Sequence, residues 1–174
     1  GKSDVIWRNS TSGTVAVWLM DGHTITSVGF PGTVSTGWAL EQIGDVDRNG
    51  TADLIWQNTN SKVVVVWLMN GATIASSKSL GGVPGEWKIV GLGDVNADRK
   101  ADIIWRNSNS GAVAVWLMNG LTVMSTGVPG SATLVFEVAG VGDVDGNGTA
   151  DLIWRNTGSG ALAFWLMNGL TIGT

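Results

Sequence analysis

The chain has 174 residues, of which 44% are hydrophobic and 14% are charged, and its formal net charge is −4. This composition supports a buried core, and the low, scattered positive charge argues against both a disordered chain and a nucleic-acid-binding surface. The absence of cysteine excludes disulfides and thiolate metal sites, the single histidine disfavours zinc, and no apolar run reaches the roughly 18 residues that would span a bilayer.

The sequence repeats without gaps, and equivalent residues differ by 49 in residue number. Three aromatic columns follow this period and contain all ten tryptophans. A tandem repeat of this length decides the fold, because each unit is one small supersecondary structure that buries its apolar face against its neighbours. The columns are Trp7, Trp56, Trp105 and Trp154; Trp18, Trp67, Trp116 and Trp165; and Trp38, Trp87 and Phe136.

Within one unit the sequence predicts four short strands. The first two are separated by an aspartate-rich loop, and the third is rich in β-branched and aromatic residues. The dipeptide Asn119-Gly120 then predicts a type I′ hairpin turn, which needs positive φ at both central residues. In chain order the strands are expected over residues 87–93, 102–107 and 112–118, with the fourth beginning at Leu121.

Four antiparallel strands in a unit of about 40–50 residues, repeated in tandem, predict the blades of a β-propeller within an all-β fold. A β-sandwich or a solenoid is the structural alternative. The chain, 1–174, is then a single repeat array. Its predicted divisions are a partial blade that lacks the innermost strand, 1–37, and three further blades, 38–86, 87–135 and 136–174.

The aspartate-rich loops have the spacing of calcium-binding loops. Aspartate or asparagine occupies positions 1, 3 and 5, and another aspartate occupies position 9. Calcium takes six to eight oxygen ligands, and these side chains can converge on one ion with the backbone carbonyl of position 7. The three loops predict about three Ca²⁺ sites, with the ligands Asp45, Asp47, Asn49, Thr51 and Asp53; Asp94, Asn96, Asp98, Lys100 and Asp102; and Asp143, Asp145, Asn147, Thr149 and Asp151.

The second loop departs from this pattern, and we expect its site to be weaker. Arg99 stands where the other loops have glycine, and Lys100 places a positive charge beside the site. Asp4 is the remnant of a fourth loop and is expected to bind nothing by itself. The alternative is that these aspartates shape turns without a metal.

A longer motif, Gly-Asp-Val-Asp-x-Asn-Gly-x-Ala-Asp-Leu-Ile-Trp, occurs at residues 44–56 and 142–154. On these residues the chain resembles the FG-GAP/VCBS repeat family, whose propeller repeats are also found in integrin α-chain heads and in some lectins. The resemblance covers essentially the whole chain. It implies that the first strand of each unit lines a central channel and that the loops bind calcium. The segments Trp-Leu-Met-Asn-Gly are similar to a bacterial, secreted subset of these repeats.

Few carboxylates are left for catalysis. Of fourteen Asp and Glu residues, only four lie outside the loops and their remnant. Glu41 and Glu137 are the one pair that a glycosidase mechanism could use, and His23 has no evident nucleophile or orienting partner. We therefore expect that the protein is not an enzyme. The four are Asp21, Glu41, Glu86 and Glu137.

The tryptophan columns are expected to pack between neighbouring units, because each ring buries a large area. Trp38 and Trp87 precede the first strands and are the preferred candidates for stacking on a sugar. The predicted function is a secreted or cell-surface bacterial module, stabilised by calcium, that binds a glycan or a cell-surface protein. A structural or adhesive scaffold from a larger secreted protein is the alternative, and a polysaccharide-active enzyme with its site in the channel is the third hypothesis.

The partial first blade has an unpaired edge, which proteins avoid leaving open. We therefore expect either a homo-oligomer or the remainder of a larger propeller to complete the array. Neither a nucleic-acid partner nor a membrane span is expected.

Overall fold

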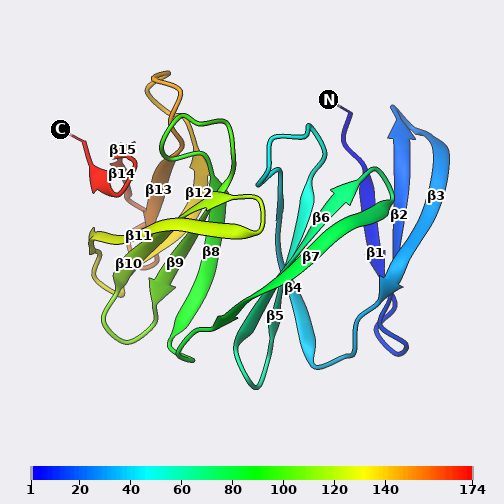
Figure 1. Cartoon of the computed structure of the whole chain (residues 1–174). Coiled ribbons are helices and arrows are strands. Elements are labelled where there is room, and N and C mark those ends of the chain that lie inside the picture. The colour runs from blue at the N-terminus through cyan, green and yellow to red at the C-terminus, as the bar shows by residue number, and fades with distance from the viewer. Residues whose placement is uncertain (1, 174) are drawn as a thin grey trace.

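The computed structural model describes residues 2–173, and every regular element within them is a β-strand (Figure 1). Gly1 and Thr174, which the predicted divisions 1–37 and 136–174 include, lie outside the described residues. The prediction of an all-β fold with antiparallel pairing is confirmed. Among residues 2–173 there is no helix that is long and apolar enough to cross a membrane.

The strands form four antiparallel sheets and one short hairpin, in sequence order. The first sheet contains β1 (Val5–Arg8), β2 (Thr14–Asp21) and β3 (Thr24–Thr33). The second contains β4 (Trp38–Gly44), β5 (Asp53–Asn58), β6 (Val63–Asn70) and β7 (Thr73–Gly82). The third contains β8 (Trp87–Gly93), β9 (Asp102–Asn107), β10 (Ala112–Asn119) and β11 (Thr122–Ser131). The fourth contains β12 (Phe136–Gly142), β13 (Asp151–Asn156) and β14 (Leu162–Trp165), and β15 (Met167–Asn168) pairs with β16 (Thr171–Ile172).

The number of strands differs between the sheets. The second and third sheets have four strands each. The first sheet has three, which correspond to the second, third and fourth strands of those sheets, and the fourth sheet has three strands followed by the hairpin. The sheets follow one another across the molecule, and the first and fourth lie at opposite sides of it (Figure 1). Below, the segments 1–37, 38–86, 87–135 and 136–174 are called units one to four.

The hairpin turn differs from the predicted type I′ turn. Asn119 pairs with Thr122, so it still belongs to β10, and the two-residue loop is Gly120-Leu121. Among the described residues of this turn only Gly120 has positive φ, at 59°. Glycine at the first central position with positive φ there alone is the pattern of a type II′ turn, which also matches the strand twist.

The core lies between the sheets. Each of three buried clusters contains side chains from two neighbouring sheets, because both faces of an interior sheet are covered by its neighbours. In the cluster between the second and third sheets, for example, Val64 and Val66 on β6 pack with Ile103 and Trp105 on β9. The tryptophan column Trp56, Trp105 and Trp154 is buried in these clusters, with 1% of each side chain exposed.

The first strands of units two, three and four approach one another closely, and glycines make this possible. A Cβ on Gly93 of β8 would lie 2.6 Å from Val141 Cγ1 and 2.7 Å from Ala150 Cβ. A Cβ on Gly91 would lie 2.5 Å from Val141 Cγ2. These separations are below any normal carbon contact, so a side chain at either position would force β8 and unit four to shift apart.

Candidate metal and ligand sites

The three aspartate-rich loops share one backbone conformation, with positive φ at positions 4 and 6. In the first loop these positions hold Arg48, at 65°, and Gly50, at 83°. The sequence predicted a glycine requirement only at position 6. The third loop has glycine at both positions, whereas the second places two side chains in the left-handed region, which costs about 1–2 kcal/mol for each L-residue. The corresponding angles are 63° for Ala97, 68° for Arg99, 78° for Gly146 and 90° for Gly148.

The first aspartate of each loop organises the turn by accepting backbone N–H groups. Asp45 Oδ1 accepts from the N–H groups of Arg48 (2.6 Å) and Asn49 (3.1 Å), and Oδ2 accepts from Gly50 N–H (2.8 Å). Asp143 accepts from the corresponding three N–H groups of its own loop. These contacts are those expected of turn-forming aspartates, and Oδ2 of each carboxylate, which accepts one bond here, keeps a second lone pair.

The aspartate at position 9 has a structural role that the sequence did not reveal. Asp53 is fully buried at the start of β5. Its Oδ2 accepts from Val46 N–H at 2.9 Å, and its Oδ1 accepts from Met69 N–H on β6 at 2.8 Å. Asp102 and Asp151 make the same pair of contacts in their own units. This carboxylate therefore links the loop to the third strand of its sheet.

Burial raises the pKa of Asp53 to about 6. The N–H groups of Met69 and Val46 oppose this by favouring the ionised form, and the neighbouring carboxylates Asp47 and Asp45 add to the rise. Burial likewise raises the pKa of Asp102 to about 6. Desolvation thus exceeds hydrogen bonding at these carboxylates, so their ionised forms carry a cost in the absence of a cation.

The first and third loops each bring three carboxylates together. Ligand oxygens of Asp45, Asp47 and Asp53 all lie within 4.8 Å of one another, as do those of Asp143, Asp145 and Asp151. Calcium–oxygen distances of 2.3–2.6 Å place two oxygens on one ion no more than about 5 Å apart, so both clusters fit a single calcium ion. Within residues 2–173 these are the two groups of three acidic side chains that converge in this way.

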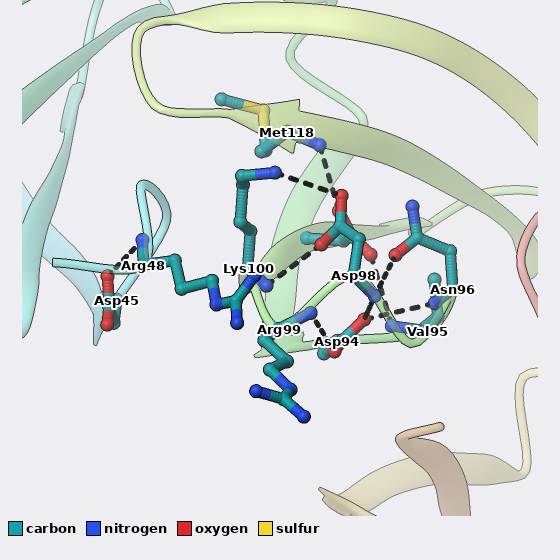
Figure 2. Close-up of polar contacts among 10 residues, drawn as sticks. Asp45, Arg48, Asp94, Val95, Asn96, Asp98, Arg99, Lys100 and Met118 are labelled. Carbon is teal, nitrogen blue, oxygen red and sulfur yellow. Dashed lines mark hydrogen bonds and ion pairs between the residues drawn. The ribbon is translucent and has the colours of Figure 1, made fainter. Parts of the chain in front are cut away.

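The second loop is arranged differently, as Figure 2 shows. Lys100 Nζ lies 3.5 Å from Asp98 Oδ2, so the protein's own cation is paired with the carboxylate at position 5. Asp98 Oδ1 also accepts from Lys100 N–H at 2.8 Å, and Asp94 accepts from Arg99 N–H at 2.5 Å. The Lys100 ammonium group is therefore in contact with the predicted ligand Asp98. The two side chains would have to separate before Asp98 Oδ2 could bind a metal.

The loops also contact the unit that follows. Asp45 C=O accepts from Ala101 N–H at 2.7 Å, and Val46 C=O accepts from Gly120 N–H at 2.7 Å. The same two bonds recur one unit later, from Ala150 N–H to Asp94 and from Gly169 N–H to Val95. A loop held in shape by a bound cation would therefore also hold the contact between neighbouring units.

A second repeated feature is an aromatic pocket in each of units two, three and four. The first has a volume of about 200 Å³ and is lined by Trp38, Trp56 and Trp67 together with residues of the 33–35 turn. Its counterparts have volumes of about 350 and 170 Å³ and contain Trp87 and Phe136, respectively, at the position of Trp38. Both predicted stacking residues, Trp38 and Trp87, are half-buried and line a pocket.

The buried rings of these pockets carry a polar group without a partner. The indole Nε1 of Trp56, Trp105 and Trp154 is buried and has no hydrogen-bond acceptor among residues 2–173. The ring of each also packs on the second tryptophan of its unit, with centroids 5.3, 5.0 and 4.9 Å apart. The pockets themselves present aromatic faces, so a ligand with an apolar face suits them.

Two arginines that directly follow first-column tryptophans in the sequence, Arg8 after Trp7 and Arg106 after Trp105, contact the next unit. The Arg8 guanidinium carbon lies 5.5 Å from the centroid of the Trp56 ring, and that of Arg106 lies 4.8 Å from the Trp154 ring. Arg8 also donates to the Trp38 carbonyl at 2.6 Å. Strand alternation points each arginine away from the tryptophan that precedes it, and only the structure shows that the arginine stacks on the tryptophan of the following unit.

The remaining carboxylate candidates occupy ordinary surroundings. Glu137 on β12 makes an ion pair of 3.6 Å with Arg155, and both side chains are more than half exposed. Glu41 lies on β4 beside Leu40, Gln42 and Ile43.

Two overlapping segments of the chain match a known repeat family. A family model described as FG-GAP-like repeat matches residues 45–105 and again residues 94–154, so that each match begins in one aspartate loop and ends at the buried tryptophan of the next unit. No protein with curated annotation matches the chain.

Proposed function

Because the chain belongs to the FG-GAP-like repeat family, we propose that it is a non-catalytic binding module that works outside the cell and is stabilised by calcium. The observation that carries this proposal is the convergence of three carboxylates in two equivalent loops, each of which also bonds to its own sheet. We further propose that its sheets are blades of a β-propeller. Sequential four-stranded antiparallel sheets with neighbouring first strands support that arrangement.

Calcium suits the two clusters better than a transition metal does. The donors are carboxylate and amide oxygens, which hard cations prefer, and the chain has no cysteine and a single histidine. Asp45, Asp47 and Asp53 would hold one ion, and the equivalent three aspartates of unit four would hold the other. A bound calcium would supply positive charge to carboxylates that otherwise repel one another, and it would stabilise the folded chain by binding to it alone.

Calcium titration by calorimetry on the metal-stripped chain tests this part of the proposal. We expect two stronger sites, a weaker third, and a rise in melting temperature. Asp47→Asn and Asp145→Asn should each remove one of the stronger sites, whereas Glu86→Gln, a carboxylate outside the loops, should leave both. A titration without heat and without thermal stabilisation would reduce the loop aspartates to turn formers and would remove the metal from the proposal.

The ligand that we propose is a glycan or the glycan-bearing part of a cell-surface protein. Indole faces stack on the C–H groups of sugar rings, and Trp38 and Trp87 each form one wall of a pocket whose other aromatic residues are fixed by packing. Since the pocket repeats along the chain, several weak contacts can act together and increase the overall affinity.

A glycan array probed with multivalent protein tests the ligand. Binding should weaken for Trp38→Ala and Trp87→Ala and should persist for Phe30→Ala, because Phe30 is 70% exposed and does not line these pockets. An array without binding at high valency would favour the alternative function, a structural or adhesive scaffold. Hydrolysis of a polysaccharide that is lost in the Glu41→Gln/Glu137→Gln double variant would instead establish the enzyme hypothesis.

A further inference from the structure

The junction between units two and three differs from the other two junctions at one repeated position. The residue after the first-column tryptophan is arginine in units one and three but glutamine in unit two. All three residues pair with the equivalent valine of the next strand, so their side chains leave the sheet on the same side, toward the following unit. The pairs are Arg8 with Val15, Gln57 with Val64, and Arg106 with Val113.

At the other two junctions the arginine is bound by a ring and by the turn that leads into the next unit. Arg8 donates to the carbonyl groups of Ser35 at 2.7 Å and Trp38 at 2.6 Å. Its guanidinium carbon lies 5.5 Å from the centroid of the Trp56 ring. The chain therefore contains two copies of a guanidinium site, and the equivalent partners of Arg106 are Thr133, Phe136 and Trp154.

Gln57 does not replace these contacts. Its amide nitrogen is as many bonds from the backbone as the Nε of arginine, and it lacks the terminal carbon and the two outer nitrogens. Gln57 is 4% exposed, and its Nε2 is buried without an acceptor among residues 2–173. The Nε of Arg8 is buried without a partner in the same way, as this equivalence predicts. The Gln57 nitrogen therefore donates to none of the carbonyl groups of the turn.

The turn that would receive an arginine is nevertheless formed at this junction. Pro84 C=O accepts from Trp87 N–H at 3.0 Å, as Ser35 C=O accepts from Trp38 N–H at 3.1 Å. Beneath it, Trp105 packs on its neighbouring ring with a centroid separation of 5.0 Å, close to the 5.3 Å of the preceding unit. The carbonyl groups of Pro84 and Trp87 are thus the counterparts of two carbonyl groups that bind a guanidinium elsewhere in the chain.

The same turn is displaced at its first residue. A Cβ on Gly13 would lie 1.8 Å from the carbonyl oxygen of Val34, and Lys62 stands at the equivalent position with a similar φ, 57° against 75°. Because Lys62 has a Cβ, the carbonyl of Val83 cannot lie where that of Val34 does. The Lys62 ammonium group donates to the Thr59 carbonyl at 2.5 Å, so it is held on its own turn.

Two further features favour a cationic ligand at this junction. The aromatic pocket lined by Val83, Trp87 and Trp105 has a volume of about 350 Å³, against about 200 and 170 Å³ for its counterparts beside the arginines. Glu86 lies in the turn itself and is exposed, so a carboxylate stands beside the pocket where the cation of the other junctions is replaced by an amide. The counterparts of Glu86 are Gly37 and Val135.

We propose that this junction binds a guanidinium group from outside the chain, carried by an arginine side chain of a peptide or protein partner. The group would stack on Trp105 and donate to the carbonyl groups of Pro84 and Trp87, as the two internal arginines do at their own junctions. A half-turn of the Gln57 amide would bring Oε1 toward it as a further acceptor. Its charge would face Glu86. A planar guanidinium suits the site better than an ammonium group, because its fixed fork of donors reaches two carbonyl groups at once.

Titration of the isotope-labelled chain with methylguanidinium, followed by NMR, tests this inference. Calcium is kept in the buffer so that it competes with the probe for the acidic loops. We expect a dissociation constant of about 1–10 mM for so small a group, with shifts centred on the Gln57 amide and the indole N–H groups of Trp87 and Trp105. Methylammonium should bind about tenfold more weakly. Glu86→Gln should weaken methylguanidinium binding by up to about fivefold, the size of an exposed ion pair.

Two substitutions exchange the junctions. Gln57→Arg supplies the guanidinium from within the chain, so it should abolish binding of the probe and raise the melting temperature. Arg106→Gln gives the next junction the same amide, so the number of sites should rise from one to two. Each variant tests the proposal without the other, and its amide spectrum shows whether it is folded.

Three results would overturn the proposal: binding that Gln57→Arg leaves undiminished, equal binding of methylammonium, and no saturation below about 100 mM. Nα-acetyl-arginine amide identifies the source of the group, and it should bind at least as tightly as methylguanidinium. Exclusion of this larger probe would overturn the assignment to an arginine side chain.

Discussion

Asp53 and Met69 are sixteen residues apart and are joined by a buried hydrogen bond of 2.8 Å between the Asp53 carboxylate and the Met69 N–H group. The second oxygen of the same carboxylate accepts from the loop at Val46. The pair recurs in the next two units, and Asp4 accepts from Met20 N–H in the first, where the rest of the loop is absent from the sequence. The position-9 aspartate is therefore part of the sheet as well as a candidate metal ligand.

This dual role predicts that Asp102→Ala destabilises the protein even without metal. The substitution leaves two buried N–H groups, those of Val95 and Met118, without an acceptor, and each costs about 1–3 kcal/mol. We expect urea unfolding in the presence of a chelator to show a loss of about 2–5 kcal/mol. Glu86→Ala, at an exposed residue directly before the same unit, should change the free energy of unfolding by less than about 0.5 kcal/mol. Equal stability of the two variants would mean that Asp102 acts only through a metal.

The raised pKa values of Asp53 and Asp102 predict an unusual pH dependence for the metal-free chain. Both have a pKa of about 6 when folded, against 3.8 for an ordinary aspartate. Between these values the unfolded chain has released the proton and the folded chain retains it. The stability that the protonated carboxyl contributes is therefore present below pH 3.8 and is lost as the pH rises through 6.

The loss should approach about 1.4 kcal/mol per pH unit for each of these groups within that window. Urea unfolding at several pH values, in chelator, measures it. With calcium bound, the ionised carboxylates are stabilised instead, so the same series should become flat or reverse. A metal-free chain whose unfolding free energy rises steadily from about pH 4 to about pH 7 would contradict the prediction.

Loop two can be converted toward the pattern of loops one and three. Arg99→Gly removes a side chain from the left-handed region, and the metal-free chain should gain up to about 1 kcal/mol, because glycine's own entropy cost offsets part of the relief. Adding Lys100→Thr removes the cation that pairs with Asp98, and calorimetry should then show a third calcium site of about the same affinity as the others. Gly50→Arg in loop one is the reverse control and should weaken that site.

The glycines of the first strands give a matched pair of substitutions. A Cβ on Gly93 would meet Val141 and Ala150 of the next unit at 2.6 and 2.7 Å, whereas a Cβ on Gly142, the equivalent residue of unit four, would meet nothing within 4 Å. Gly93→Ala should therefore lower the unfolding free energy by about 1–3 kcal/mol through overpacking. Gly142→Ala should be neutral or slightly stabilising. Thermal melts of both variants distinguish overpacking between units, which affects only Gly93→Ala, from an effect of alanine on the strand itself, which would affect both.

Much of the fold could be predicted from the sequence, because the residues that specify its strands and loops lie in short segments that repeat along the chain. The strands over 87–93 and 102–107 were predicted with their observed bounds, since turn residues border each apolar run. The oxygen spacing of the loops predicted three candidate cation sites, and three carboxylates converge in two of them, the first and third loops. The prediction of a type I′ turn at Asn119-Gly120 was wrong, because Asn119 remains paired with Thr122 and the two-residue loop is Gly120-Leu121.

By itself, the sequence determined the repeat, its strand order and three loops of candidate oxygen ligands, because these depend on residues close to one another in the chain; the structure brings three carboxylates together in two of these loops. Only the tertiary structure decided which face of each sheet is covered, where the position-9 carboxylates find their second partner, and that Arg106 stacks on Trp154. Such contacts join residues of different strands or units, and their register follows from packing between sheets. The same packing distinguishes the exposed Trp7 from three buried tryptophans in an identical sequence position.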